Sequence, residues 1–247
     1  NLEKIIEFDG SNEYKNKHWF EHIMLNESGN RFAFYHRFET ERGFFTKCIT
    51  ADTNGKNLWN VPISGSELIS HLGWKNDNEF VIFTRTISAI QQAWVGKATN
   101  KPKEGIVRYI YRKFIKPLIP QTVKAGIIPE APSFYSSFID TDGHNGKIEV
   151  VPHCMDGHPS FSSCKRYMLT DTYADDNGYR HLLLHNLITN KTLRLGSFFS
   201  YYNNSNWRAD LHPRFSFCNT KVIIDMNHSG ITGIAIIDIS KIKHDLC

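Results

Sequence analysis

The sequence lacks any long hydrophobic run, so no segment is expected to span a bilayer as a helix. It also lacks a Cys-x-x-Cys pair: the five cysteines are scattered, which excludes a zinc ribbon, and their odd number argues against a disulfide framework. The chain begins at Asn1 without the charged and apolar segments of a signal peptide, which is consistent with a removed natural start. Localisation stays open between the periplasm, secretion and the cytoplasm of a bacterium.

Common catalytic motifs are absent as well. No Walker loop, G-x-S-x-G elbow, H-E-x-x-H pair or Rossmann fingerprint occurs. Helical periodicity is weak almost throughout. What is present is a chain of 247 residues, 40% of them hydrophobic and rich in aromatic side chains, which is enough to bury a core.

An internal repeat organises much of this chain. Four segments align without gaps: 22–35, 71–84, 158–171 and 212–225. Each begins with His, reaches a turn, and then enters a strand rich in β-branched or aromatic residues. Short strands in units of roughly 40–50 residues are typical of β-propellers, whose units are four-stranded blades. The larger gap between the second and third segments fits one repeat plus an insertion.

Further strands follow each repeat start, and a polar turn separates two extended runs in 44–62, 137–152 and 179–196. A β-sandwich would also use short strands, but it gives no reason for a His to recur at the head of each unit. We therefore expect an all-β propeller domain over residues 1–247, with about four blades that begin near residues 22, 71, 158 and 212.

The segment 1–8, NLEKIIEF, is expected to form the final strand of a blade. Either the chain is the C-terminal part of a longer propeller, or this strand completes the last blade, in which only three strands are counted. Four blades is the bottom of the usual range, which favours the first interpretation.

A long basic insertion, about residues 96–132, interrupts the pattern. Its window 97–124 holds eight basic residues and one acid, so the rest of the chain carries a net charge of −3. Insertions of this length are usually functional loops or disordered segments. The remaining chain lacks a matching basic face, so no nucleic-acid partner is expected, and the insertion suits an anionic substrate.

The recurrent histidines are the strongest functional signal. Because the innermost strand of every blade lies along the central channel, the histidines at the repeat starts should converge at one mouth of it: His22, His71, His158 and His212. Converging imidazoles can bind a divalent metal or act as general acid or base. The alternative is a set of hydrogen-bonded structural residues.

Other polar residues are expected near the same mouth. Arg208, Asp210 and Arg214 surround His212, and an arginine there offers a planar fork for a carboxylate, or else braces Asp210 in a loop between blades. Three further candidates are His36 after a strand, Tyr173 at a strand end, and His244 in the C-terminal tail.

The sequence resembles the propeller polysaccharide lyases, most closely the oligogalacturonate lyase type and more loosely the ulvan lyases. The resemblance runs from about Phe32 to His244, apart from the insertion, and rests on FAFYHRFE, SHLGW, GHPSFS, DLHPRFS and IIDISKIKH in the family's order. It implies a seven-bladed propeller that cleaves uronate-containing glycans by β-elimination.

The resemblance also implies catalytic residues. His71 in SHLGW matches the family's active-site histidine. Lys47 falls about where the family has an arginine that removes the C5 proton of the uronate, with Arg42 as a competing candidate. His22 and Arg208 complete the catalytic candidates, and Arg42, His36, Tyr173 and Arg214 those for substrate binding.

The family's manganese site provides the metal candidates. His158 and His244 match two of its histidines, and the family's Gln-x-x-His pair is replaced by Trp207 and Asp210. Asp can ligate a hard cation whereas Trp cannot. We therefore expect His158, Asp210, His212 and His244 to hold a divalent metal, manganese, calcium or zinc.

The leading hypothesis is a lyase that acts on an acidic oligosaccharide or polysaccharide. The alternative from another class is a non-catalytic propeller that binds glycan or protein through the same mouth. Hydrolysis by paired carboxylates is a weaker third interpretation, because acidic residues are not prominent at the expected blade heads.

Overall fold

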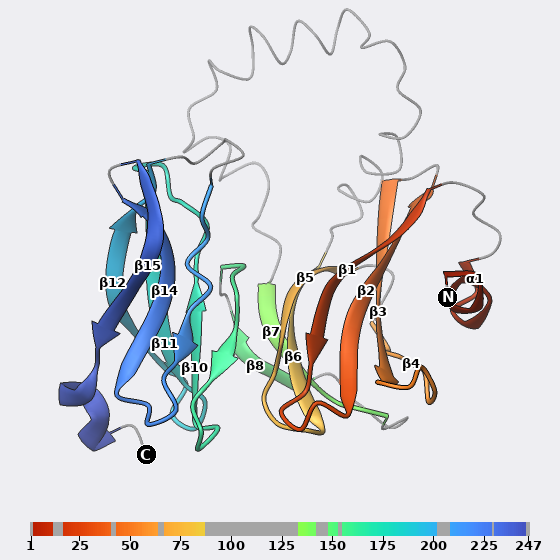
Figure 1. Cartoon of the computed structure of the whole chain (residues 1–247), viewed down its shortest axis with the longest axis horizontal. Coiled ribbons are helices and arrows are strands. Elements are labelled where there is room, and N and C mark those ends of the chain that lie inside the picture. Colours follow the sequence, from red (N-terminus) through yellow and green to blue (C-terminus); the bar gives the residue numbers. More distant parts are fainter. Residues whose placement is uncertain are drawn as a thin grey trace, which may run out of the picture.

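The computed structural model of the chain describes residues 2–11, 17–40, 43–63, 67–86, 133–141, 148–152, 155–201, 208–228 and 230–245. These residues form four antiparallel sheets, three with four strands and one with three. The sheets stand side by side as successive blades (Figure 1). The expected all-β propeller fold is therefore confirmed.

The first two blades take up the N-terminal part of the chain. Blade 1 contains β1 (His18–Leu25), β2 (Arg31–Thr40), β3 (Gly43–Asp52) and β4 (Trp59–Asn60). Blade 2 contains β5 (Glu67–Trp74), β6 (Glu79–Thr86), β7 (Ser133–Ile139) and β8 (Ile148–Pro152). The expected basic insertion, about 96–132, lies outside the described residues, between strands β6 and β7, which pair directly.

Two more blades follow. Blade 3 contains β9 (Ser160–Phe161), β10 (Tyr167–Asp171), β11 (Tyr179–Asn186) and β12 (Lys191–Phe199). Blade 4 contains β13 (Arg214–Phe215), β14 (Lys221–His228) and β15 (Ile231–Asp238), and the 3-10 helix η4 (Ser240–Asp245) follows it. The innermost strands are neighbours in chain order, because β1 contacts β5, β5 contacts β9, and β9 contacts β13.

Apolar cores lie between adjacent blades. Alternation along β2 sends Ala33 and Tyr35 toward Phe80 and Ile82 of blade 2. Val81, Phe83 and Tyr135 of blade 2 pack with Met168 of blade 3. Leu182 and Leu184 of β11 pack with Val222 and Ile224 of blade 4. Side-chain hydroxyls also join neighbouring blades: that of Tyr135 donates to the carbonyl of Gly157 over 2.8 Å.

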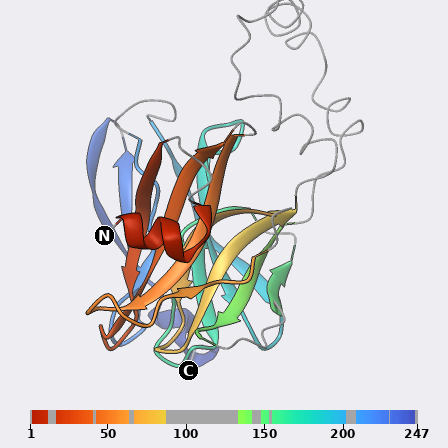
Figure 2. The same ribbon diagram turned by 90° about the vertical axis from the view of Figure 1, so that its right-hand side faces the viewer.

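The expectation for residues 1–8 was wrong. Residues Leu2–Phe8 form the helix α1, which lies against the outer face of blade 1 (Figure 2). Ile5 is buried there against Phe34 and Ile49. Leu, Glu and Lys favour a helix, and eight residues with adjacent isoleucines do not distinguish the two periods.

Cys164 is disulfide-bonded. The odd cysteine count argued against a disulfide framework, not against a single disulfide. Cys48 is free and buried, and Cys218 is free and exposed. Among the described residues, no helix has the length and apolar character to cross a bilayer.

Candidate functional site

The four histidines that begin the repeats form a continuous row across the blades. The ring centroids of His22 and His71 are 5.3 Å apart, those of His71 and His158 are 3.9 Å apart, and those of His158 and His212 are 4.1 Å apart. The row follows from the fold, because each histidine lies in or just before the innermost strand of its blade, and these strands are neighbours.

The backbone at this row is unusual. His22 and His212 have φ values of 55° and 41°, in the left-handed region that residues other than Gly seldom adopt. The pairing registers of β1 and β5 shift at His22 and His71. Strained backbone and β-bulges concentrate at functional sites, where they aim a side chain away from the regular strand direction.

Three of the histidines are oriented by carboxylates. The Nδ1–carboxylate distances are 2.9 Å for His71–Asp156, 2.9 Å for His158–Asp171 and 3.0 Å for His212–Asp225. A neutral imidazole that donates its Nδ1 proton to a carboxylate presents the lone pair of Nε2 to a ligand or proton.

The sequence contained a signal for two of these carboxylates. Asp171 and Asp225 each lie thirteen residues after their histidine, at the last position of the aligned repeats. The second repeat has Thr84 at this position, and Asp156, from the connection into the next blade, takes over as the partner of His71. Sequence reasoning paired none of the three with its histidine.

Asp171 joins blades 3 and 4 beneath the row. It is buried and accepts backbone N–H groups from His158 at 2.6 Å, Leu211 at 2.8 Å and His212 at 3.3 Å. Burial raises its pKa, but the bonds from His158 and the backbone outweigh burial and lower it below the ordinary value. A Cβ on Gly157 would lie 1.8 Å from the Asp171 carbonyl oxygen, so only glycine fits there.

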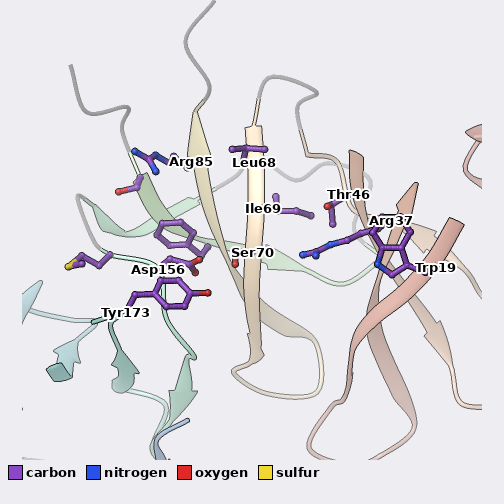
Figure 3. Close-up of a pocket in the computed structure, with 12 residues that line it drawn as sticks. Trp19, Arg37, Thr46, Leu68, Ile69, Ser70, Arg85, Asp156 and Tyr173 are labelled. Atoms are coloured by element: carbon purple, nitrogen blue, oxygen red, sulfur yellow. The ribbon is translucent and has the colours of Figure 1, made fainter. Parts of the chain in front are cut away.

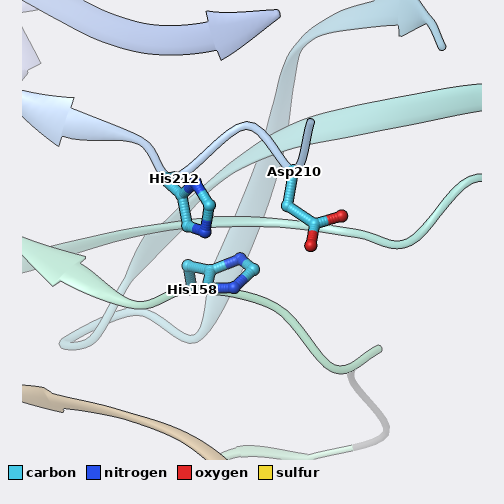
Figure 4. Close-up of side chains that lie close together, drawn as sticks. All are labelled: His158, Asp210 and His212. Carbon is cyan, nitrogen blue, oxygen red and sulfur yellow. The ribbon is translucent and has the colours of Figure 1, made fainter. Parts of the chain in front are cut away.

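The row ends in a candidate metal centre. One ligand atom from each of His158, Asp210 and His212 lies within 4.8 Å of the other two (Figure 4). The His158 side chain is 15% exposed and that of His212 is 46% exposed, so the centre opens to solvent on the side of blade 4.

Asp210 also lies between two arginines. Its Oδ2 accepts from Arg208 Nη2 over 3.0 Å. Its Oδ1 lies 2.6 Å from Nη1 of the buried Arg180 but has no well-aligned hydrogen bond among the described residues. The expected arginine–aspartate brace is thus present, and both oxygens of Asp210 lie next to a guanidinium.

A cavity of about 700 Å³ lies beside the row. It extends from blade 1 across β5 to the start of blade 3 (Figure 3). Its lining is mixed aromatic, polar and charged: Trp19, Arg37, Thr46, Leu68, Ile69, Ser70, Phe83, Arg85, Ser133, Met155, Asp156 and Tyr173. Two of these, Asp156 and Tyr173, also contact His71.

Tyr173 contributes a hydroxyl group to this cavity. Its ring centroid lies 6.1 Å from that of His71, and the Arg208 guanidinium lies 5.4 Å from the ring. Burial, together with the negative charges of Asp156 and Asp210, raises the pKa of Tyr173 to about 12. The hydroxyl is therefore protonated near neutral pH and can donate a hydrogen bond or a proton.

Two histidines of the row favour the neutral form. Burial lowers the pKa of His22, and the nearby His71 and Arg37 lower it further. Burial also lowers the pKa of His158, against the opposing effect of Asp171. Neutral imidazoles near pH 7 are able to accept a proton or to ligate a metal.

Two sequence candidates lie away from the row. His36 is fully buried on the outer face of blade 1, where its Nδ1 lies 2.6 Å from Asp9 Oδ2 and its Nε2 lies 3.0 Å from His18 Nδ1. Lys47 donates to the Asp9 carbonyl. Strand alternation sends both side chains toward α1, whereas their neighbours Arg37 and Thr46 line the cavity.

The remaining site residues expected from the sequence do not lie together in the structure. Arg214 is exposed on β13 and donates to the Pro213 carbonyl over 3.0 Å. Arg42 and Trp207 lie outside the described residues, as does the side chain of His244, whose backbone belongs to η4. The cavity arginines Arg37 and Arg85 were not foreseen, because arginines on strands are too common to single out.

Comparisons with known proteins agree on the fold. No family profile and no curated protein matches the chain. An oligogalacturonate lyase solved in complex with manganese superposes with a TM-score of 0.57 at 11% identity, over 89% of this chain and 48% of that one. An oligogalacturonate lyase from Vibrio parahaemolyticus gives 0.55 at 12% identity, over 89% and 49%.

Other propellers are similar too. A candidate dipeptidyl aminopeptidase IV from Bacteroides ovatus superposes with a TM-score of 0.51 at 10% identity, over 88% of this chain and 31% of that one. The chain spans about half the length of the two lyases that it resembles. At these identities the likeness shows the fold alone, and function has to be argued from the site. The chain is thus built like the blades of β-propeller proteins.

Proposed function

We propose that this protein is a polysaccharide lyase that cleaves a uronate-containing acidic glycan by β-elimination. One observation carries the proposal: Asp156, which holds His71 Nδ1, lines a cavity that contains two arginines, and a candidate metal centre lies at the end of the same histidine row. The oligogalacturonate lyases found among the structural neighbours add support at the level of fold.

The reaction needs three groups. A base removes the C5 proton, which is α to the uronate carboxylate, and the electron pair left behind forms the C4=C5 double bond. The C4–O bond breaks, and the leaving oxygen takes up a proton. Negative charge grows on the carboxylate meanwhile, so cations must stand close to it.

The residues at the site match these needs. His71 Nε2 accepts the C5 proton, since Asp156 holds Nδ1 and stabilises the imidazolium that forms. Tyr173, protonated near neutral pH, donates to the leaving oxygen. Arg37 and Arg85 supply positive charge in the cavity. Lys47, an expected base, donates to the carbonyl of Asp9, just after α1, and has no part in this scheme.

His158, Asp210 and His212 would hold the divalent metal. The residues fit the group, because carboxylates hold Nδ1 of both imidazoles and leave their Nε2 atoms for a ligand, and Asp210 adds a carboxylate within 4.8 Å of them. Two nitrogen donors suit Mn²⁺ or Zn²⁺ better than Ca²⁺, which prefers six to eight oxygens. Such an ion neutralises carboxylate charge as a Lewis acid.

The test is ultraviolet absorbance of the unsaturated product. The full-length protein is incubated with pectate, alginate and ulvan, with added Mn²⁺ or with a chelator. His71→Ala should abolish product formation, whereas His181→Ala, a histidine outside the row that contacts Ser197 and Asp175, should not. No product from any uronate polymer, where a control lyase works, would contradict the proposal.

A non-catalytic binding propeller is the alternative, favoured by the aromatic and cationic lining of the cavity. His71→Ala separates the two functions. A binding module keeps most of its glycan affinity in this variant, whereas a lyase loses turnover.

A further inference from the structure

Arg37 is a cation in the cavity whose side chain is fixed by an ion pair. It lies on β2 directly opposite Thr46 of β3, and both residues line the cavity. Its Nη1 lies 2.6 Å from Glu21 Oε2. Its Nε is buried and has no hydrogen-bond partner among the described residues.

Glu21 orients three side chains at this end of the cavity. Its Oε1 accepts the Trp19 indole N–H over 2.6 Å, while its Oε2 contacts Arg37 and lies 3.6 Å from His22 Nδ1. Figure 3 shows Trp19 and Arg37 next to each other at one end of the cavity. The ammonium of Lys17 lies 5.6 Å from the Trp19 ring and adds positive charge.

We propose that Arg37 binds the carboxylate of an anionic sugar that lies against Trp19, and that Glu21 is the positioning residue for both side chains. A guanidinium held through Nη1 keeps its Nη2 donors and its positive charge for a carboxylate. An indole offers an apolar surface to a sugar ring. The choice of a uronic acid as ligand rests on the proposed function.

The experiment is calorimetric titration of the full-length protein with D-galacturonate, which has no glycosidic bond to cleave. D-galactose, which lacks the carboxylate, is the matched ligand. Wild type should bind galacturonate and not galactose. Arg37→Ala should raise the Kd about 10- to 100-fold, the range of a lost charge-assisted hydrogen bond. Arg37→Lys should recover little, and Arg194→Ala on exposed β12 should match wild type.

The role of Glu21 is tested by a double-mutant cycle. Glu21→Gln alone should weaken galacturonate binding. In the Arg37→Ala background it should have little further effect, because Gln keeps an oxygen that can accept the Trp19 indole N–H and loses only the charge that holds Arg37. A merely structural role would weaken binding in both backgrounds. Should Arg37→Ala fail to fold, Arg37→Lys and Glu21→Gln carry the test.

Three results overturn the inference: no galacturonate binding by wild type, equal binding of galactose, or an unchanged Kd in Arg37→Ala. They can be told apart from failure of the proposed function. If uronate polymers are cleaved but Arg37→Ala leaves the Kd for galacturonate unchanged, only the inference fails. If Arg37-dependent binding occurs and no polymer is cleaved, the lyase proposal fails and the inference stands.

Discussion

Replacing Asp171 with Asn tests the organisation of the histidine row. Asp171 Oδ1 accepts from the backbone N–H of His158, Oδ2 accepts from the backbone N–H groups of Leu211 and His212, and His158 Nδ1 lies within 3.1 Å of both oxygens. Whichever oxygen becomes NH₂, at least one backbone N–H then faces a donor. A buried unsatisfied donor costs about 1–3 kcal/mol, and the remaining bonds lose their charge assistance.

We therefore expect Asp171→Asn to lower the free energy of unfolding by about 2–4 kcal/mol. The assay is urea unfolding followed by tryptophan fluorescence. Asp225→Asn is the matched control: it removes the equivalent carboxylate in the next repeat, where the side chain is 49% exposed, and it should cost less than about 1 kcal/mol. Equal stability of the two variants would refute the reasoning.

The pH dependence follows from the lowered pKa of Asp171. A carboxyl group with a lowered pKa in the folded state contributes its full stability above the unfolded pKa, about 3.9, and loses it as the pH falls through the folded pKa. The stability gap between wild type and Asp171→Asn should thus shrink as the pH falls below about 4. A gap that keeps widening below pH 4 would contradict this assignment.

Two further predictions concern single positions. Gly157→Ala forces a Cβ to within 1.8 Å of the Asp171 carbonyl oxygen and should destabilise the fold by several kcal/mol in thermal unfolding, whereas Gly233→Ala, with nothing within 4 Å, should change little. Hydrogen bonds, chiefly from Thr220, lower the pKa of the exposed Cys218 to about 7. The rate of its alkylation, measured by mass spectrometry, should therefore increase as the pH rises past 7 and then level off. The buried Cys48, whose pKa is raised, should react only after unfolding. Equal reactivity of both thiols would contradict this assignment.

The fold and the histidine row could be predicted from sequence because both follow from repetition. A side chain repeated at the start of each blade comes to the same place on neighbouring inner strands, whatever the details of packing. His22, His71, His158 and His212 therefore came together as expected. Asp210 joined them because it lies two residues before His212.

What escaped prediction depends on alternation and on contacts between distant segments. Period-two alternation puts neighbours on opposite faces, so an error of one residue sends a side chain to the other side of the blade. His36 and Lys47 thus face α1, while Arg37 and Thr46 face the cavity. The helix α1 gains its stability from packing on blade 1, which no local pattern shows.

The most direct test of the central proposal is mass spectrometry of products from an acidic glycan treated with the full-length protein. β-Elimination yields a new non-reducing end that is lighter by one water molecule than the end left by hydrolysis. The account predicts this lighter unsaturated product with wild type and its loss in His71→Ala. A product of hydrolytic mass, or no cleavage of any uronate polymer, would contradict it.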